Sequence, residues 1–305
     1  ARGAVEGSDY CRFLMFEGFA HQRIAVDGRD IDLVAGGRGP PLLLLHGFPQ
    51  TRAAWAAVAP RLAGRFALVI PDLPGYGASQ APDPTPAHDS QSKRRMAATL
   101  AAAMTALGHR RFFVAGHDRG GRVAYRMALD LPQRVAGLAL LDIMTTLDTW
   151  EAMDWQAALA AYHWPFLALP PPTPERMIGA DPAAYLDHLI DRWKGRGAVL
   201  PAPALAAYHA AFAKPAVIAA MCEDYRAGAD IDIRLDRADR AAGRRIDLPL
   251  LVLRGVQYAP RPMAAAWQPW VNQVAEVALD CGHFIAEEKP EETADALARH
   301  FAASI

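Results

Sequence analysis

The chain has 305 residues, a length that suits one globular core carrying a large insertion. Its 32 Lys and Arg residues against 33 Asp and Glu leave a formal net charge of −1, which argues against a nucleic-acid or anionic-membrane binder. Hydrophobic residues make up 52% of the chain, and no apolar run approaches the roughly 18 residues that span a bilayer, so we expect a soluble globular protein.

The cysteines and the first residues indicate the cellular compartment. Cys11, Cys222 and Cys281 lie far apart and have no spacing typical of zinc ligands, so we expect neither a metal site nor a disulfide framework. Residues 1–14 lack the charged-then-apolar pattern of a secretory signal. We interpret them as a polar leader and expect a cytoplasmic protein.

Short apolar runs predict strands that are buried on both faces. They follow a strand-like stretch over 16–34, in which Asp27-Gly28 suits a hairpin turn, and they lie at 41–46, 67–72, 112–116, 135–142, 249–254 and 274–279. Helical patterns lie between them at 55–62, 91–107, 121–131, 263–270 and 291–301. This alternation predicts an α/β fold with a parallel sheet covered by helices on both faces.

One stretch, 147–240, breaks the alternation. It has no buried-strand pattern, is rich in Ala, Trp, Tyr and Pro, and contains a proline cluster at 170–174. Because it is too long for a loop, we predict a helical cap over a core made of 1–146 and 241–305. Caps exclude water and supply substrate-specific side chains, so we expect the site between cap and sheet.

The segment GHDRGG at 116–121 lies between a predicted strand and a predicted helix. Small residues at both ends allow the tight turn of a nucleophile elbow, here with Asp118 in place of Ser or Cys. A carboxylate at this position, kept ionised by the helix N-terminus, can displace a leaving group from carbon and form an alkyl ester. The structural alternative is that Asp118 only caps the helix.

Partners for this nucleophile follow from chain order. The backbone N–H groups of Arg119 and of Phe48, in the turn His46-Gly47-Phe48-Pro49, are the expected oxyanion donors. His283 follows the last predicted strand and is the expected general base. The turn at 254–258 has no carboxylate, so we predict that Asp142 orients His283 from the end of the preceding strand; a helix N-cap is its alternative role.

Arg119 and Arg122 lie three residues apart and therefore on one face of the helix after Asp118. Two guanidinium forks beside an anionic nucleophile would bind a second anion bidentately, which predicts a small carboxylic acid that carries a leaving group. The alternative is that both arginines pair with Asp72 or other acids of the core.

With these motifs in place, the sequence resembles the haloacetate dehalogenases, most closely the fluoroacetate dehalogenases, of the α/β-hydrolase superfamily. The resemblance runs from about residue 15 to the C-terminus and is carried by HGFPQT (46–51), PDLPGYG (71–77), GHDRGGRVAYRMALD (116–130), LDI (141–143), YHWPF (162–166), MCEDYRAGA (221–229) and CGHF (281–284). It implies an α/β-hydrolase fold with an eight-stranded sheet, and halide donors at His163, Trp164 and Tyr225. It also implies hydrolysis of a haloacid through an aspartyl ester, without metal or cofactor, by a homodimer.

Two other functions stay open at this point. Haloalkane dehalogenases and epoxide hydrolases share the elbow aspartate but typically carry tryptophan after it, where this sequence has Arg119. Epoxide hydrolases also use two cap tyrosines, which this stretch could supply from Tyr162, Tyr185, Tyr208 and Tyr225. A non-catalytic protein that binds small acids is the other alternative, and the complete set of Asp, His and acid positions argues against it.

Overall fold

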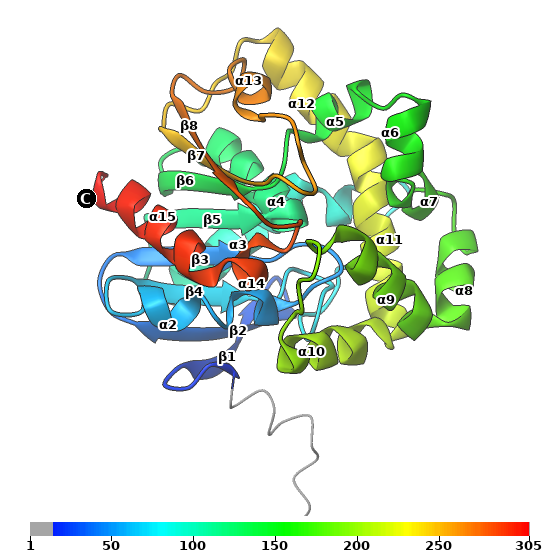
Figure 1. Ribbon diagram of the computed structural model, residues 1–305, viewed down its shortest axis with the longest axis horizontal. Helices are drawn as coiled ribbons and strands as arrows, with labels where there is room; N and C mark the ends of the chain where they lie inside the picture. The colour runs from blue at the N-terminus through cyan, green and yellow to red at the C-terminus, as the bar shows by residue number, and fades with distance from the viewer. Residues whose placement is uncertain (1–14, 305) are drawn as a thin grey trace, which may run out of the picture.

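The computed structural model describes residues 15–304, so the predicted polar leader and Cys11 lie outside the described residues. The described strands form one eight-stranded sheet in the order β1-β2-β4-β3-β5-β6-β7-β8 (Figure 1). β1 pairs antiparallel with β2 and β2 with β4, while all other neighbours are parallel. The strands are β1 (Ala20–Val26), β2 (Arg29–Gly37), β3 (Pro41–Leu45), β4 (Ala67–Pro71), β5 (Phe112–His117), β6 (Val135–Leu141), β7 (Leu250–Gly255) and β8 (Val274–Leu279).

The central strands are buried on both faces because their alternating side chains enter two apolar layers. Leu43 and Leu45 of β3 pack in a layer with residues of α3 and α4, whereas Leu42 and Leu44 pack in a second layer with α2, α14 and α15. The helices of this core are α2 (Ala59–Leu62), α3 (Lys93–Ala106), α4 (Asp118–Asp130), α13 (Ala264–Trp267), α14 (Ile285–Glu288) and α15 (Pro290–Ala302). The predicted α/β fold with helices on both faces is confirmed.

The chain between β6 and β7 is helical, and we call α5 to α12 the inserted helices (green to yellow in Figure 1). They are α5 (Thr146–Glu151), α6 (Trp155–Ala160), α7 (His163–Leu167), α8 (Thr173–Ala180), α9 (Pro182–Trp193), α10 (Ala202–Phe212), α11 (Pro215–Ala229) and α12 (Ile231–Ala241). Proline stands in the first turn of α8 to α11, where its missing N–H costs no helical hydrogen bond. Within residues 15–304 no single helix is long and apolar enough to cross a membrane; α10 together with Pro215–Ala241 is, by length and composition, but this pair is bent by 88°.

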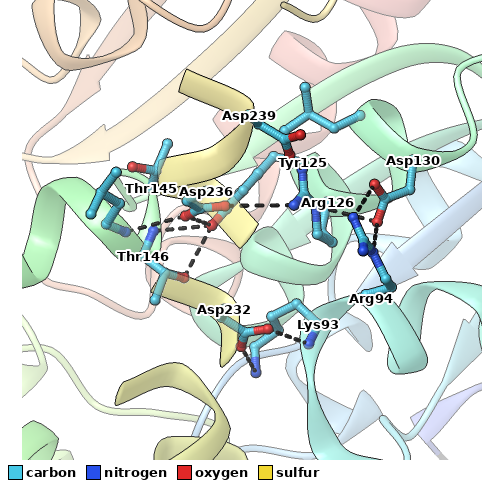
Figure 2. A network of polar contacts seen from close by, with 12 residues as sticks. Lys93, Arg94, Tyr125, Arg126, Asp130, Thr145, Thr146, Asp232, Asp236 and Asp239 are labelled. Carbon is cyan, nitrogen blue, oxygen red and sulfur yellow. Dashed lines mark hydrogen bonds and ion pairs between the residues drawn. The ribbon is translucent and has the colours of Figure 1, made fainter. Parts of the chain in front are cut away.

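Buried polar contacts tie α12 to α4 (Figure 2). Tyr125 of α4 donates a hydrogen bond from its hydroxyl to Asp236 Oδ2 at 2.7 Å, and Arg126 forms an ion pair with Asp239. Asp236 also accepts the backbone N–H of Leu147 at 3.2 Å. The inserted helices are therefore fixed to the helix that follows the predicted nucleophile.

One local prediction is confirmed by the structure, and two differ from it. The hairpin turn at Asp27-Gly28 is confirmed, and both residues have positive φ, 50° and 76°. The helix predicted over 55–62 is wrong: a 3-10 turn, Arg52–Trp55, is followed by the separate helix α2, because Pro60 cannot donate the hydrogen bond that a continuous helix needs. β8 was expected to be fully buried, but its side chains are half-buried or exposed because it forms an edge of the sheet.

Candidate active site

Asp118 lies at the sharp turn between β5 and α4 and has a φ of 46°, a left-handed conformation that is strained for a residue other than glycine. His117, not Asp118, occupies the N-cap position of α4. The side chain of Asp118 instead accepts the backbone N–H of Phe48 at Oδ1 over 2.8 Å. A Cβ atom on Gly47 would lie 2.5 Å from Asp118 Cβ, so only glycine permits this close approach. The structure thus places Asp118 as an elbow residue that faces the predicted oxyanion turn.

His283 and Asp142 are brought together from distant parts of the chain. Asp142 follows β6 and accepts a hydrogen bond from His283 Nδ1 at Oδ2, over 2.7 Å. Its other oxygen, Oδ1, accepts the backbone N–H of Gly255 at 3.2 Å. Because Nδ1 donates to the carboxylate, the Nε2 atom of the neutral ring is free to accept a proton.

The imidazole of His283 is held beside Asp118 without bonding to it. Its Nε2 atom lies 3.9 Å from Asp118 Oδ2, longer than a hydrogen bond. The rings of Tyr258 and His117 flank it at centroid distances of 4.3 and 4.5 Å. The backbone N–H of His283 donates to Trp193 O of α9 at 2.8 Å, so an inserted helix also fixes this residue.

The surroundings of Asp118 keep it ionised. Burial raises the pKa of the Asp118 carboxyl, but the nearby His283 and His117 rings and the two guanidinium groups lower it by more, to about 2. Burial and the proximity of His283 lower the pKa of His117 to about 3, so this ring is neutral at physiological pH. A buried carboxylate that stays ionised can act as a nucleophile.

Arg119 and Arg122 are both buried, and the protein itself occupies most of their N–H groups. Arg119 donates through Nε and Nη2 to the carboxylate of Asp224, over 3.0 and 2.6 Å. Arg122 donates through Nη1 to Met144 O and through Nη2 to Thr149 Oγ1, over 3.1 and 3.3 Å. Arg119 thus pairs with an acid of the core, which confirms the alternative for this residue, although the acid is Asp224 and not Asp72, which binds Arg52. The binding of a substrate carboxylate by Arg119 and Arg122 stays a prediction. Among residues 15–304, Arg119 Nη1 and Arg122 Nε have no hydrogen-bond partner.

The three predicted halide donors lie together on α7 and α11. The Tyr225 ring is 5.8 Å from both His163 and Trp164 and 5.3 Å from Phe48, measured between centroids. The Arg119 guanidinium lies 4.2 Å from the Tyr225 ring and that of Arg122 lies 4.4 Å from the Trp164 ring, both as cation–π contacts. The arginines and the aromatic side chains therefore form one continuous set around Asp118.

Two of these aromatic residues carry polar atoms that the rest of the described chain leaves unbonded, His163 Nδ1 and Tyr225 Oη. Burial lowers the pKa of His163 to about 3 and raises the pKa of Tyr225 well above its usual range. Both groups are therefore neutral near pH 7. A buried polar atom without a partner is costly, which is typical of an atom that serves a ligand.

The other tyrosines that the sequence nominated differ in surroundings. Tyr208 donates its hydroxyl to Glu287 Oε1 at 2.9 Å and is thereby engaged in the core. Tyr185 stacks on Phe212 at 6.1 Å, and Tyr162 is half-buried, 6.3 Å from the His163 ring. Of the four, Tyr225 is the one that contacts both Phe48 and Arg119.

Sequence reasoning missed two residues that support the predicted oxyanion turn, Gln50 and Glu287. Gln50 accepts the N–H of Gly47 at 3.2 Å and His117 Nδ1 at 2.9 Å through Oε1, and donates from Nε2 to Glu287 over 2.6 Å. Burial raises the pKa of the Glu287 carboxyl to about 8. Gln50 belongs to the HGFPQT motif and could have been noticed, whereas Glu287 stands in an ordinary acidic doublet of the sequence.

The two cysteines in the described part of the chain are not among the residues of this site. Cys222 and Cys281 are buried free thiols, and burial raises the pKa of each to about 12. In the described range 15–304, no group of three or more His, Cys, Asp or Glu side chains is arranged to hold a metal ion.

Known proteins resemble this chain over nearly its whole length. A family model described as the alpha/beta hydrolase fold matches residues 40–290. The chain is 42% identical to a fluoroacetate dehalogenase from Burkholderia sp, covering 92% of this chain and 93% of the relative. It is 30% identical to a soluble epoxide hydrolase from Corynebacterium sp. (strain C12), covering 92% and 97%. A solved mutant of a protein from Pseudomonas aeruginosa that is described as an epoxide hydrolase, with bound MFA, matches at 43% identity and a TM-score of 0.88, covering 94% and 97%. The chain therefore belongs to the α/β-hydrolase family.

Proposed function

We propose that this hydrolase removes the halogen from haloacetates, converting fluoroacetate and water to glycolate and fluoride through an ester of Asp118. The observation that carries the proposal is the ring of unbonded N–H and O–H groups around an ionised, buried aspartate: Arg119 Nη1, Arg122 Nε, His163 Nδ1 and Tyr225 Oη. Two cations suit a carboxylate, and two neutral donors suit a departing halide. The 42% identity to a fluoroacetate dehalogenase supports the same substrate class.

In the first step the substrate carboxylate binds to the guanidinium groups of Arg119 and Arg122, one N–H edge from each. Asp118 Oδ1 is held by the Phe48 N–H, so Oδ2 is the oxygen that attacks the α-carbon. The new C–O bond forms as the carbon–halogen bond breaks, and the halide leaves with the bonding electron pair. His163, Trp164 and Tyr225 receive the halide.

Fluoride makes the donors necessary. It is a small, strongly hydrated ion, and releasing it into a dry site without N–H or O–H groups would be very unfavourable. Donors that are already in place replace its water shell and need no reorganisation during the reaction. Because the pKa of Tyr225 is raised, its hydroxyl keeps the proton that a phenolate would lack, and the neutral His163 ring still carries one N–H to donate.

In the second step His283 activates a water molecule. Its Nε2 atom accepts a proton from the water, whose oxygen attacks Cγ of the Asp118 ester. The negative charge that develops on Oδ1 is stabilised by the N–H of Phe48, with the Arg119 N–H as the predicted second donor. Asp142 stabilises the protonated imidazole, which gives its proton to the leaving oxygen as the Cγ–Oδ2 bond breaks. Glycolate leaves with the former Oδ2 atom, the second proton of the water passes to solvent, and the Asp118 carboxylate and neutral His283 are restored. These steps need no metal or organic cofactor.

Epoxide hydrolysis is the second candidate. Asp118 would open the epoxide in the same way, and Tyr225 and His163 would donate hydrogen bonds to the ring oxygen. The 30% identity to a soluble epoxide hydrolase favours testing it. A neutral epoxide, however, gives the buried Arg119 and Arg122 no anion to bind, so we rank it second.

The test is release of free fluoride from fluoroacetate, with chloride from chloroacetate and diol from styrene oxide measured in parallel. We expect fluoride and chloride release by the wild type and none by the Asp118→Ala variant. Chloride without fluoride would keep Asp118 and the arginines but remove the fluoride role of His163, Trp164 and Tyr225. Diol formation without halide release would replace the proposal with epoxide hydrolysis, and tight haloacetate binding without any turnover would indicate a non-catalytic binding protein.

A further inference from the structure

Asp224 is a buried carboxylate of α11 that the steps above do not use. It is 0% exposed and receives three hydrogen bonds from Arg119. Nε and Nη2 bind its two carboxylate oxygens over 3.0 and 2.6 Å, and Nη2 also donates to its backbone oxygen over 2.9 Å. Asp224 therefore fixes the plane of the Arg119 guanidinium and leaves Nη1 as the edge without a partner among the described residues.

Two further groups of the core hold Asp224 from its other side. Lys93, at the start of α3, forms an ion pair with Oδ1, and the Tyr76 hydroxyl donates to Oδ2 over 2.6 Å. Lys93 is itself anchored by Asp232 of α12, which accepts the Lys93 backbone N–H over 2.9 Å (Figure 2). Asp224 thus cannot turn away from Arg119 without breaking contacts to α3 and to the loop after β4.

The same segment of α11 carries one of the proposed halide donors. Tyr225 is the next residue, and its ring covers the Arg119 guanidinium at 4.2 Å. Gly228 lies one turn further along, where a Cβ atom would come within 3.1 Å of Arg119 Nη2. One helix therefore positions both the arginine and the tyrosine that the proposed reaction needs at opposite ends of a two-carbon substrate.

We propose that Asp224 is a positioning residue that selects for an acid substrate by fixing which edge of Arg119 meets the substrate carboxylate. This inference rests on the proposed function. A free arginine beside an anion can adopt many orientations, whereas Asp224 allows only one, aligned with Tyr225 on the same helix. Lys93 supplies a second positive charge to Asp224, so the carboxylate does not cancel the attraction of Arg119 for the substrate.

The test compares an acid with its uncharged analogue, chloroacetate with chloroacetamide, in the wild type and in Asp224→Asn. An asparagine keeps the volume but turns one acceptor into an N–H donor, which must face Arg119, Lys93 or Tyr76 and breaks the fork. We expect kcat/KM for chloroacetate to fall about 100-fold, mostly through KM, and that for chloroacetamide to fall less than about threefold. Lys93→Met should lower the preference for the acid about fivefold.

Asp236→Asn is the matched control. It also removes a buried carboxylate that joins an inserted helix to α4, but its partners are Tyr125, the Leu147 N–H and, at 3.9 Å, Arg126, not Arg119. We expect it to leave the acid-to-amide ratio unchanged, whatever it does to stability. The role of Asp224 would be overturned if Asp224→Asn lowered kcat/KM equally for both substrates. It would also be overturned if the acid-to-amide ratio stayed unchanged in both Asp224→Asn and Lys93→Met. Either result would leave the proposed function intact. A wild type that does not prefer chloroacetate would overturn the proposed function itself and this inference with it.

Discussion

Two turns at the carboxyl ends of neighbouring strands carry an aspartate each, and the two carboxyl groups behave differently. Asp118 after β5 and Asp142 after β6 both have positive φ, 46° and 57°, and both are buried. Burial raises the pKa of each. Nearby His283, His117 and two arginines lower the pKa of Asp118 to about 2. The pKa of Asp142, by contrast, stays above its usual value despite the hydrogen bond to His283. Burial alone does not decide the state of a carboxyl; the polar and charged groups around it also do.

Hydrogen bonding separates the two turns further. Both oxygens of Asp142 are bonded, one to His283 and one to the Gly255 N–H. Asp118 has the Phe48 N–H on Oδ1, while its Oδ2 lies 3.9 Å from His283 Nε2. A carboxylate with both oxygens occupied orients its partner, and one with a less occupied oxygen can react.

The largest expected effect comes from Asp118→Asn, which removes the reactive member of the pair. The amide is a very poor nucleophile, so halide release from chloroacetate should fall by at least about 10⁵-fold. Halide-selective electrodes measure it, with circular dichroism as the folding control. Residual turnover within about tenfold of wild type would show that Asp118 does not attack carbon.

His283→Asn should separate the two steps. The carboxylate of Asp118 still attacks, but nothing activates water, so turnover should fall by about 10⁴-fold while the ester accumulates. Intact-mass analysis after exposure to fluoroacetate should show one covalent adduct per chain, mapped by peptide mass to Asp118. An unmodified chain would contradict the covalent route.

Asp142→Asn tests the bonded member of the pair. An amide at this position can donate to the ring and favour the wrong tautomer, so ester hydrolysis should slow roughly 10³-fold while the first, alkylation step changes little. A rapid burst of halide followed by slow turnover in stopped-flow measurements is the expected pattern. A missing burst would mean that Asp142 also supports the attack by Asp118.

Glu287 extends the comparison to a buried carboxyl that forms no ion pair with any cation of residues 15–304. Its pKa rises from 4.5 to about 8, so between these values the folded chain holds a proton that the unfolded chain releases. Stability should therefore decrease as pH rises from about 4.5 to 8, by up to about 5 kcal/mol from this group. Urea unfolding of Glu287→Gln should remove this part of the slope. A slope identical to wild type would show that Glu287 is ionised in the folded chain.

Much of this geometry could be predicted from the sequence, because it depends on local pattern. Apolar runs gave the strands, and the segment GHDRGG marked the turn at Asp118. His283 and Asp142 followed from their places after strands, and the structure brings them within 2.7 Å of each other. Asp224 could not be found this way: its partner Arg119 is 105 positions earlier in the chain, and only the tertiary fold brings the two side chains together. For the same reason the sequence could not show which acid of the core would pair with Arg119.

The burial of the two thiols has a consequence for the proposed function, because haloacetates alkylate thiolates irreversibly. With pKa values of about 12, Cys222 and Cys281 are thiolate in only roughly one molecule in 10⁵ near neutral pH. Asp118, by contrast, would be alkylated in every turnover of the proposed reaction and then released by water. In the proposed reaction Asp118 is thus alkylated and then regenerated with the help of His283. Cys222 and Cys281, whose alkylation would be irreversible, are kept unreactive.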